Sequence, residues 1–336
     1  MKKVVLVLVA ILATFFTDKS VSAQTTQVHQ PRFHFQLSPD GKQIAYLQAV
    51  GQQPLVIQVW IANSDGTQTH KLTDSYNNQS HLVWSPNNAT IALNEIKEDS
   101  SEYTIIDMHT AQKLTESRGS VRTFTPDSKG VIVEYSGADS TQPGSYLTLL
   151  DGTVNLKFLS GGIGFAYSPN GKQIAYRALA SDFENIYLMQ ADGSNVQKLA
   201  NGNGNPKWSA DGTTIGFVTS DGNDLAMIRN WWLQTILLPS KTVTLVHQGK
   251  GVPDFQWSPV TNSIIVTDKN QQGDDEILSL NLGSQQWLTN TMDSNLEPEW
   301  SPDGKTIYFA SMRSGYEDIY TMNEAGKNQL LLIPQP

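Results

Sequence analysis

A short turn phrase recurs seven times along this chain of 336 residues, and it constrains the fold more than any other feature. The phrase consists of an aromatic residue or leucine, then Ser or Thr, Pro, Asp or Asn, and Gly, or a decayed version of this pattern. Its serine or threonine positions lie 40 to 49 residues apart, at Ser38, Ser85, Thr125, Ser168, Ser209, Ser258 and Ser301. Self-similarity at such a period indicates a repeat architecture.

Each repeat reads as four short strands. Proline presets φ for a turn, Asp or Asn bonds its own backbone, and Gly accepts a left-handed conformation. An alternating run follows the turn, as in Gln43–Tyr46 and Thr306–Phe309, and predicts a half-buried strand. Segments such as Ile186–Met189 and Lys113–Thr115 supply the third and fourth strands. The sequence therefore predicts an all-β fold, a β-propeller of four-stranded antiparallel blades.

Seven copies of the phrase predict seven blades, with six or eight as open alternatives. The first copy begins near the first strand of blade one, and Leu330–Ile333 fits the last strand of blade seven. Each blade is then built from consecutive strands. We expect the ring to close by packing of blade seven against blade one, unless residues 25–32 add a strand across the seam.

The phrases Leu37–Gly41, Tyr167–Gly171 and Trp300–Gly304 resemble the WD40-like repeat of the TolB β-propeller family. They are also similar to the propellers that precede the catalytic domain in prolyl-oligopeptidase-type enzymes. The resemblance covers about residues 33 to 333. It implies the fold and a binding role, and it does not identify a partner.

The first residues predict export. Lys2 and Lys3 precede a predominantly apolar run from Val4 to Phe16, and Val21–Ala23 offers small residues for cleavage, so residues 1–23 read as a signal peptide. The apolar run spans about 20 Å as a helix, short of the roughly 30 Å hydrocarbon core. We expect a single propeller domain over 24–336, periplasmic or secreted, with no stable membrane insertion after cleavage.

Composition narrows the function classes. The chain has no cysteine, so neither a disulfide framework nor a lipid-modified cysteine is expected. Its 32 acidic and 23 basic residues give a formal net charge of −9, which disfavours nucleic acid as a partner. The sequence also lacks a Gly-x-Ser-x-Gly elbow, a His-Glu-x-x-His zinc motif and a phosphate-binding loop. These absences favour binding over catalysis.

The two faces of the ring differ in sequence. The turn face carries the stereotyped first-to-second and third-to-fourth strand turns. The connecting face carries the second-to-third strand loops and the inter-blade connections, whose sequences vary most. Because function tends to lie on variable loops held by a rigid scaffold, we expect the binding surface on the connecting face.

One position per repeat points to a site at the mouth of the central channel. It lies four residues before each motif serine or threonine, where the innermost strand enters from the connecting face: His34, His81, Val121, Gly164, Asn205, Asp254 and Glu297. The predicted binding residues are the polar members of this set, His34, His81, Asn205, Asp254 and Glu297. A hydrated polar rim without a ligand is the alternative interpretation.

The leading functional hypothesis is an exported, non-catalytic recognition module that binds a protein or peptide of the periplasm or cell envelope, with no cofactor. The alternative is a metal-dependent enzyme acting on an extracellular polysaccharide, such as a propeller-fold lyase. Imidazole and carboxylate groups suit divalent metal ions. In that hypothesis the candidate ligands are His34, His81, Asp254 and Glu297.

Two further groups allow a functional and a structural interpretation. Asp274, Asp275 and Glu276, with Asp268, could hold calcium through oxygen ligands or form a solvated loop. The tandem Trp231 and Trp232 could form a stacking platform or belong to the core. We expect the solvated loop and the core.

Overall fold

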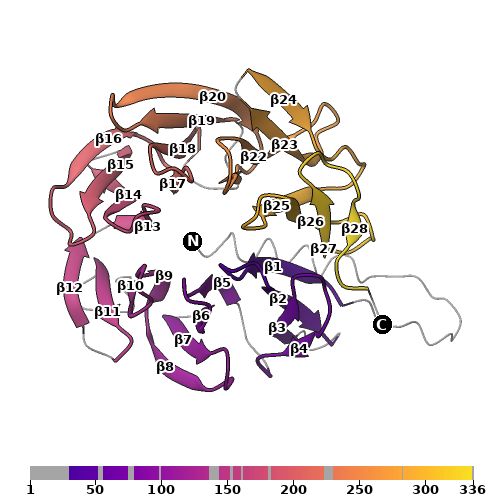
Figure 1. The fold of residues 1–336 in the computed structure, drawn as a ribbon, viewed down its shortest axis with the longest axis horizontal. Helices are drawn as coiled ribbons and strands as arrows, with labels where there is room; N and C mark the ends of the chain where they lie inside the picture. The colour runs from indigo at the N-terminus through magenta and orange to yellow at the C-terminus, as the bar shows by residue number, and fades with distance from the viewer. Residues whose placement is uncertain are drawn as a thin grey trace, which may run out of the picture.

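The computed structural model describes residues 30–334 except for 52–55, 75–78, 98–99, 136–143, 152–153, 160–161, 181–182, 223–229 and 282. The described residues form seven four-stranded antiparallel sheets arranged as the blades of a ring (Figure 1). The predicted seven-bladed propeller is confirmed. The predicted signal peptide lies outside the described residues.

Each blade uses four consecutive strands, ordered from the central axis outward. Blade 1 contains β1 (Arg32–Leu37), β2 (Gln43–Val50), β3 (Val56–Asn63) and β4 (His70–Lys71). Blade 2 contains β5 (Gln79–Trp84), β6 (Thr90–Ile96), β7 (Ser101–Asp107) and β8 (Lys113–Arg118). Blade 3 contains β9 (Ser120–Phe124), β10 (Gly130–Tyr135), β11 (Gly144–Leu149) and β12 (Val154–Leu159). Blade 4 contains β13 (Gly162–Tyr167), β14 (Gln173–Ala180), β15 (Phe183–Gln190) and β16 (Gln197–Asn201).

The last three blades follow the same order. Blade 5 contains β17 (Lys207–Trp208), β18 (Thr214–Ser220), β19 (Asn230–Leu237) and β20 (Thr242–Lys250). Blade 6 contains β21 (Phe255–Trp257), β22 (Ile264–Lys269), β23 (Asp275–Asn281) and β24 (Ser284–Trp287). Blade 7 contains β25 (Asn295–Trp300), β26 (Thr306–Ser311), β27 (Asp318–Asn323) and β28 (Leu330–Leu331).

The repeated phrase is a hydrogen-bonded hairpin turn. In blade 1 the Ser38 hydroxyl donates to Asp40 Oδ1 at 2.8 Å and accepts the Gln43 amide at 2.9 Å, while Gly41 takes a left-handed φ of 68°. Blades 2 and 3 replace this glycine with Asn88 and Ser128, which also have positive φ. Their side chains accept the backbone amides of the preceding blades' turns, as Asn88 Oδ1 does from Asp40 at 3.0 Å. The phrase therefore builds and joins the turns, which accounts for its recurrence.

Packing between blades supplies the core. A cluster of buried apolar side chains fills each interface between neighbouring blades, including Leu47, Leu82 and Ile91 between blades 1 and 2. The middle strands are buried on both faces, as in β2, whose six central residues are all buried. Equivalent clusters lie between the other neighbours. Since each blade needs both neighbours to cover its faces, the ring is one cooperative unit.

Blades 7 and 1 pack against each other across the seam, while residues 25–29 of the alternative closing segment lie outside the described residues. In the described part of the chain, the sheet of blade 7 holds β25–β28 alone. Arg32 joins the two blades: its amide donates to Glu317 O at 2.9 Å, and its guanidinium donates to Ile333 O at 2.8 Å and lies 3.3 Å from Asp318 Oδ1. A mixed apolar cluster that includes Tyr46 and Ile319 covers the same seam.

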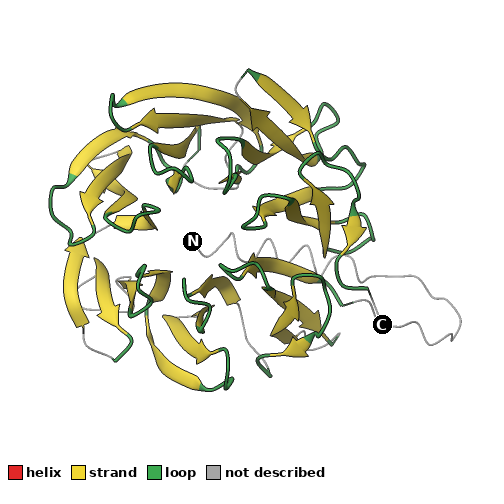
Figure 2. Cartoon of the chain, viewed as in Figure 1, coloured by secondary structure: helices red, strands yellow, loops and turns green. Residues whose placement is uncertain are grey.

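Strands and loops account for all the described residues, which contain no helix (Figure 2). Consequently, this part of the chain has no helix that is long and apolar enough to cross a membrane.

Candidate functional site around the central axis

The innermost strands bring the predicted site residues around the central axis of the ring (Figure 1). His34 lies on β1, His81 on β5 and Glu297 on β25. Asn205 lies two residues before β17, and Asp254 lies one residue before β21. The His34 and Glu297 side chains are 40% and 34% exposed although their strands are innermost. Water therefore reaches these side chains at the axis.

His34 and Glu297 form a close pair across the seam. His34 Nδ1 lies 2.6 Å from Glu297 Oε1. Both residues have left-handed backbones, with φ of 47° and 51°, and each lies at a break in the register of its innermost strand. The same repeat position in blade 4 is Gly164, with φ of 64°. Left-handed backbone is uncommon for residues other than glycine, and such strain gathers at functional sites. At this left-handed position, blades 1 and 7 carry the ionisable residues His34 and Glu297, whereas blade 4 carries Gly164.

The environment of His34 favours its protonated form. Burial lowers the pKa of His34, but the hydrogen bond to Glu297 and the negative charges of Glu297 and Glu317 outweigh burial and raise it above 6.5. These surroundings therefore favour an ion pair between the imidazolium of His34 and the carboxylate of Glu297.

We expect Glu297→Gln to lower the pKa of His34, because the variant removes both the charge and the anionic acceptor. The pKa is measured by NMR titration of the imidazole signals. Glu324→Gln changes an exposed carboxylate in a distant turn of the same blade and serves as the control. A His34 pKa that stays the same in Glu297→Gln would contradict this account of the pair.

Two carboxylates that the sequence analysis missed lie close to this pair. Burial raises the pKa of Glu299 to about 8, and the charges of Asp254 and Glu297 add to the shift, although the Leu37 amide and Lys207 oppose it. Burial likewise raises the pKa of Glu317 to about 7. The negative charges of Glu297 and Asp318 raise this pKa further, whereas the positive charge of His34 lowers it. Glu299 accepts the Leu37 amide at 3.2 Å, so it also holds the seam. In the sequence, Glu299 stands two residues before the motif serine Ser301.

Asp254 and His81 do not join the His34–Glu297 pair. Lys207, a third missed residue, places Nζ 3.0 Å from Asp254 Oδ1 and also donates to Phe255 O at 2.6 Å. The pKa of His81 is lowered to about 4, because the protein around the imidazole disfavours its charged form and Arg122, His34 and Lys207 add positive charge. His81 is therefore a neutral imidazole at neutral pH.

No three His, Asp or Glu side chains within the described ranges are grouped closely enough to hold a metal ion. Two of the four candidate ligands, His34 and Glu297, contact each other, and Asp254 is paired with a lysine. A metal ion on this set would have to displace the ammonium group of Lys207 from Asp254. Metal binding by these four residues stays a prediction.

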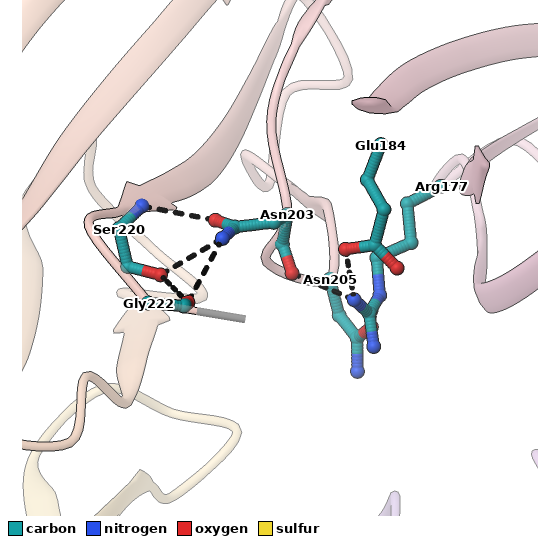
Figure 3. A network of polar contacts seen from close by, with 6 residues as sticks. All are labelled: Arg177, Glu184, Asn203, Asn205, Ser220 and Gly222. Atoms are coloured by element: carbon teal, nitrogen blue, oxygen red, sulfur yellow. Dashed lines mark hydrogen bonds and ion pairs between the residues drawn. The ribbon is translucent and has the colours of Figure 1, made fainter. Parts of the chain in front are cut away.

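Asn205 belongs to a polar network between blades 4 and 5 on the connecting face (Figure 3). Arg177 donates to Asn205 Oδ1 at 2.8 Å, to Glu184 Oε2 at 2.7 Å and to Asn203 O at 2.7 Å. Asn203 in turn accepts the Ser220 amide and donates to the Ser220 hydroxyl, both at 2.9 Å. The network fixes the inter-blade connection and presents Asn205, which remains exposed.

Some expectations were wrong. Val121, the blade 3 member of the repeat position, is fully buried among apolar residues, and Arg122 is the exposed residue in its place, bonded to Glu134 Oε2 at 2.5 Å.

The acidic group of blade 6 is not a solvated loop throughout. Glu276 and Asp268 are buried, and Asp268 lies 2.8 Å from His247 Nε2.

The remaining acidic and tryptophan contacts are structural. Glu276 accepts Asn295 Nδ2 at 2.8 Å, and Asp275 lies 3.0 Å from Lys269 Nζ. Trp231 is fully buried between blades 5 and 6, so its predicted place in the core is confirmed. These contacts hold neighbouring strands together.

Comparisons with known proteins agree with the fold. Residues 206–332 match the model of the TolB beta propeller domain. A protein TolB homolog from Chlorobium chlorochromatii is 30% identical over 149 residues, which cover 43% of this chain and 32% of the relative. The match thus spans about a third of that relative's length. The TolB-like resemblance of the repeats is confirmed.

Solved structures share the architecture at low identity. TolB from Acinetobacter baumannii is 17% identical with a TM-score of 0.55, over 87% of this chain and 63% of that one. An oligogalacturonate lyase in complex with manganese is 14% identical with a TM-score of 0.60, over 88% and 89%. The propeller domain of the Trilobed protease from Pyrococcus furiosus is 13% identical with a TM-score of 0.63, over 92% and 100%. At these identities the likeness concerns the fold alone.

Proposed function

We propose that this chain is an exported, non-catalytic recognition module that binds a protein or peptide partner in the periplasm or cell envelope through its connecting face. The N-terminal segment with Lys2, Lys3 and the apolar run Val4–Phe16 supports export. The TolB-like propeller supports a binding module. No cofactor is part of this proposal.

The observation that carries the proposal is the set of exposed apolar side chains on the connecting face. Met292 is 92% exposed, Leu179 65%, Val252 47% and Tyr316 37%. Val252 and Met292 lie on inter-blade connections, and Tyr316 lies between β26 and β27. Leu179 lies at the end of β14, which points to the same face. Large apolar side chains presented by a rigid scaffold are the usual anchors of protein interfaces.

Rigid polar contacts support these loops. The Arg177–Asn203 network fixes the connection between blades 4 and 5. Thr291, next to Met292, donates its amide to buried Glu276 at 2.5 Å. Because these contacts hold the connections at Asn203 and Thr291 in place, little conformational entropy is lost there when a partner docks. The ionisable side chains at the axis would then supply charge for orientation.

The proposal is tested with residues 24–336 immobilised and exposed to envelope extract, with captured proteins identified and quantified. We expect Met292→Asp to reduce capture of the specific partner about ten-fold or more, since burying an unpaired charge in an apolar contact costs more than about 1.4 kcal/mol. Val260→Asp is the matched control, because Val260 is 58% exposed on the turn face. Equal capture by all three proteins, or greater loss with Val260→Asp, would contradict the proposal.

A further inference from the structure

The outermost strand of blade 5 differs from those of the other blades. β20 has nine residues, the longest strand in the described part of the chain, whereas the other outermost strands have two to six. It pairs with β19 on its inner side and ends the sheet on its outer side. Figure 1 shows β20 along the outer rim, far from the axis. An open edge of this length is a template for another strand.

Apolar side chains gather at the first half of this edge. Thr242 to Val246 are all exposed, with Val243 at 44%, Leu245 at 55% and Val246 at 39%. Leu237, the strand neighbour of Thr242, is also exposed. Edge strands usually avoid aggregation through short length or charged side chains, and this stretch has neither. The edge therefore has the features of a docking site.

The edge is held rigid at both ends. Lys241 Nζ donates to Gln197 Oε1 of blade 4 at 3.0 Å. His247 Nε2 lies 2.8 Å from Asp268 Oδ2 of blade 6, and the Lys250 amide donates to Asp268 Oδ1 at 2.8 Å. The register with β19 breaks at Val246, between Leu245 and His247, which separates the open half from the anchored half. The open half is therefore preorganised to accept a strand.

The charged residues that flank the open half of β20 indicate what kind of segment binds this edge. The segment from residue 238 to 252 contains Lys241 and Lys250 but no Asp or Glu, although the whole chain has a net charge of −9. Antiparallel self-pairing of two copies in the register centred between Leu245 and Val246 would bring Lys241 of one copy beside Lys250 of the other, which disfavours that register. The two lysines instead complement a segment with acidic ends.

We propose that β20 binds an extended segment of a partner protein that has alternating apolar residues and acidic residues at its ends. The segment adds a fifth strand to blade 5 by backbone hydrogen bonding to Thr242–Val246. This surface is separate from the connecting face, so the proposal does not depend on the function proposed above.

The test uses a labelled nine-residue peptide with a valine and threonine core and two aspartates at each end, and fluorescence anisotropy measures its binding. We expect the full mature chain to bind this probe about ten-fold more tightly than a probe with lysines at its ends. Leu245→Asp and Lys250→Glu should each weaken binding about ten-fold, or about 1.4 kcal/mol. Leu114→Asp, at a leucine 53% exposed on the outermost strand of blade 2, should leave binding unchanged.

Three results would overturn the proposal: no binding by the wild-type chain, equal binding of both probes, or an equal loss in Leu114→Asp and Leu245→Asp. Near-ultraviolet circular dichroism confirms that each variant is folded. Sedimentation of the wild-type chain tests the alternative occupant. A dimer that is lost in Leu245→Asp would show that a second copy occupies the edge and would contradict a partner segment.

Discussion

Replacing Arg32 with methionine is expected to lower the free energy of unfolding by about 3–5 kcal/mol, because it leaves the carboxylate of Asp318 buried without its charged partner. Arg32 is 5% exposed and Asp318 fully buried. The same side chain donates to Ile333 O, the carbonyl that follows the last strand of blade 7. In the described residues the sheet of blade 7 holds only β25–β28, so these contacts contribute directly to closure of the seam.

Urea unfolding followed by tryptophan fluorescence measures this loss. Arg122→Met is the matched control, since Arg122 and Glu134 form an ion pair whose side chains are 38% and 24% exposed. Such partly solvated pairs contribute about 0–1 kcal/mol. If Arg32→Met costs no more than Arg122→Met, the seam does not depend on the buried pair.

Glu299→Gln is expected to stabilise the ring at alkaline pH. Because burial raises the pKa of Glu299 to about 8, its carboxyl binds a proton in the folded chain where the unfolded chain has lost it. The stability that this group contributes is present in full below its ordinary pKa of 4.5 and is lost as the pH rises towards 8. The expected slope is at most about 1.4 kcal/mol per pH unit.

Glutamine keeps an oxygen that can accept the Leu37 amide, so the variant removes the ionisation and retains that contact. Wild type and Glu299→Gln should therefore be closest in stability near pH 5 and diverge progressively as the pH rises from 5 towards 8, with the variant more stable. Urea unfolding across pH 5–9 measures the difference, and Glu324→Gln, at an exposed position, is the control. A variant with the same pH dependence as wild type would show that Glu299 ionises normally in the folded chain.

The fold could be predicted because its signal is local. Ser38, Asp40 and Gly41 hydrogen-bond within their own turn, and the same chemistry recurs in the other blades, so a pattern of a few residues fixes each hairpin. Blade 6 shows the limit of the pattern. Its turn lacks the acidic residue, and Ser258 Oγ accepts the amides of Val260 and Thr261 instead.

The site could be predicted only in outline. Counting back from the motif serine placed His34, His81 and Glu297 at the axis, because the repeat fixes the start of each innermost strand. Counting back four residues does not place Val121 at the axis. The β-bulge of blade 3 lies at Arg122, so the Val121 side chain packs in the core instead. Which side chains pair was beyond the sequence, since those contacts join different blades.

Partner choice by Asp254 illustrates the same limit. From its position Asp254 could face blade 5 or blade 7, and the structure shows the pair with Lys207 of blade 5. Likewise, the raised pKa of Glu299 depends first on its burial and then on the charges around it, which include Asp254 from a different blade. Long-range packing sets these interactions, and no local motif encodes them.

Hydrogen–deuterium exchange of the mature chain, free and bound to its captured partner, tests the central claim most directly. The account predicts slower exchange in the complex at the connecting segments 202–206, 251–254, 289–294 and 312–317, with no change at the turns 38–42, 168–172 and 301–305. Protection confined to those turns would contradict the assignment of recognition to the connecting face.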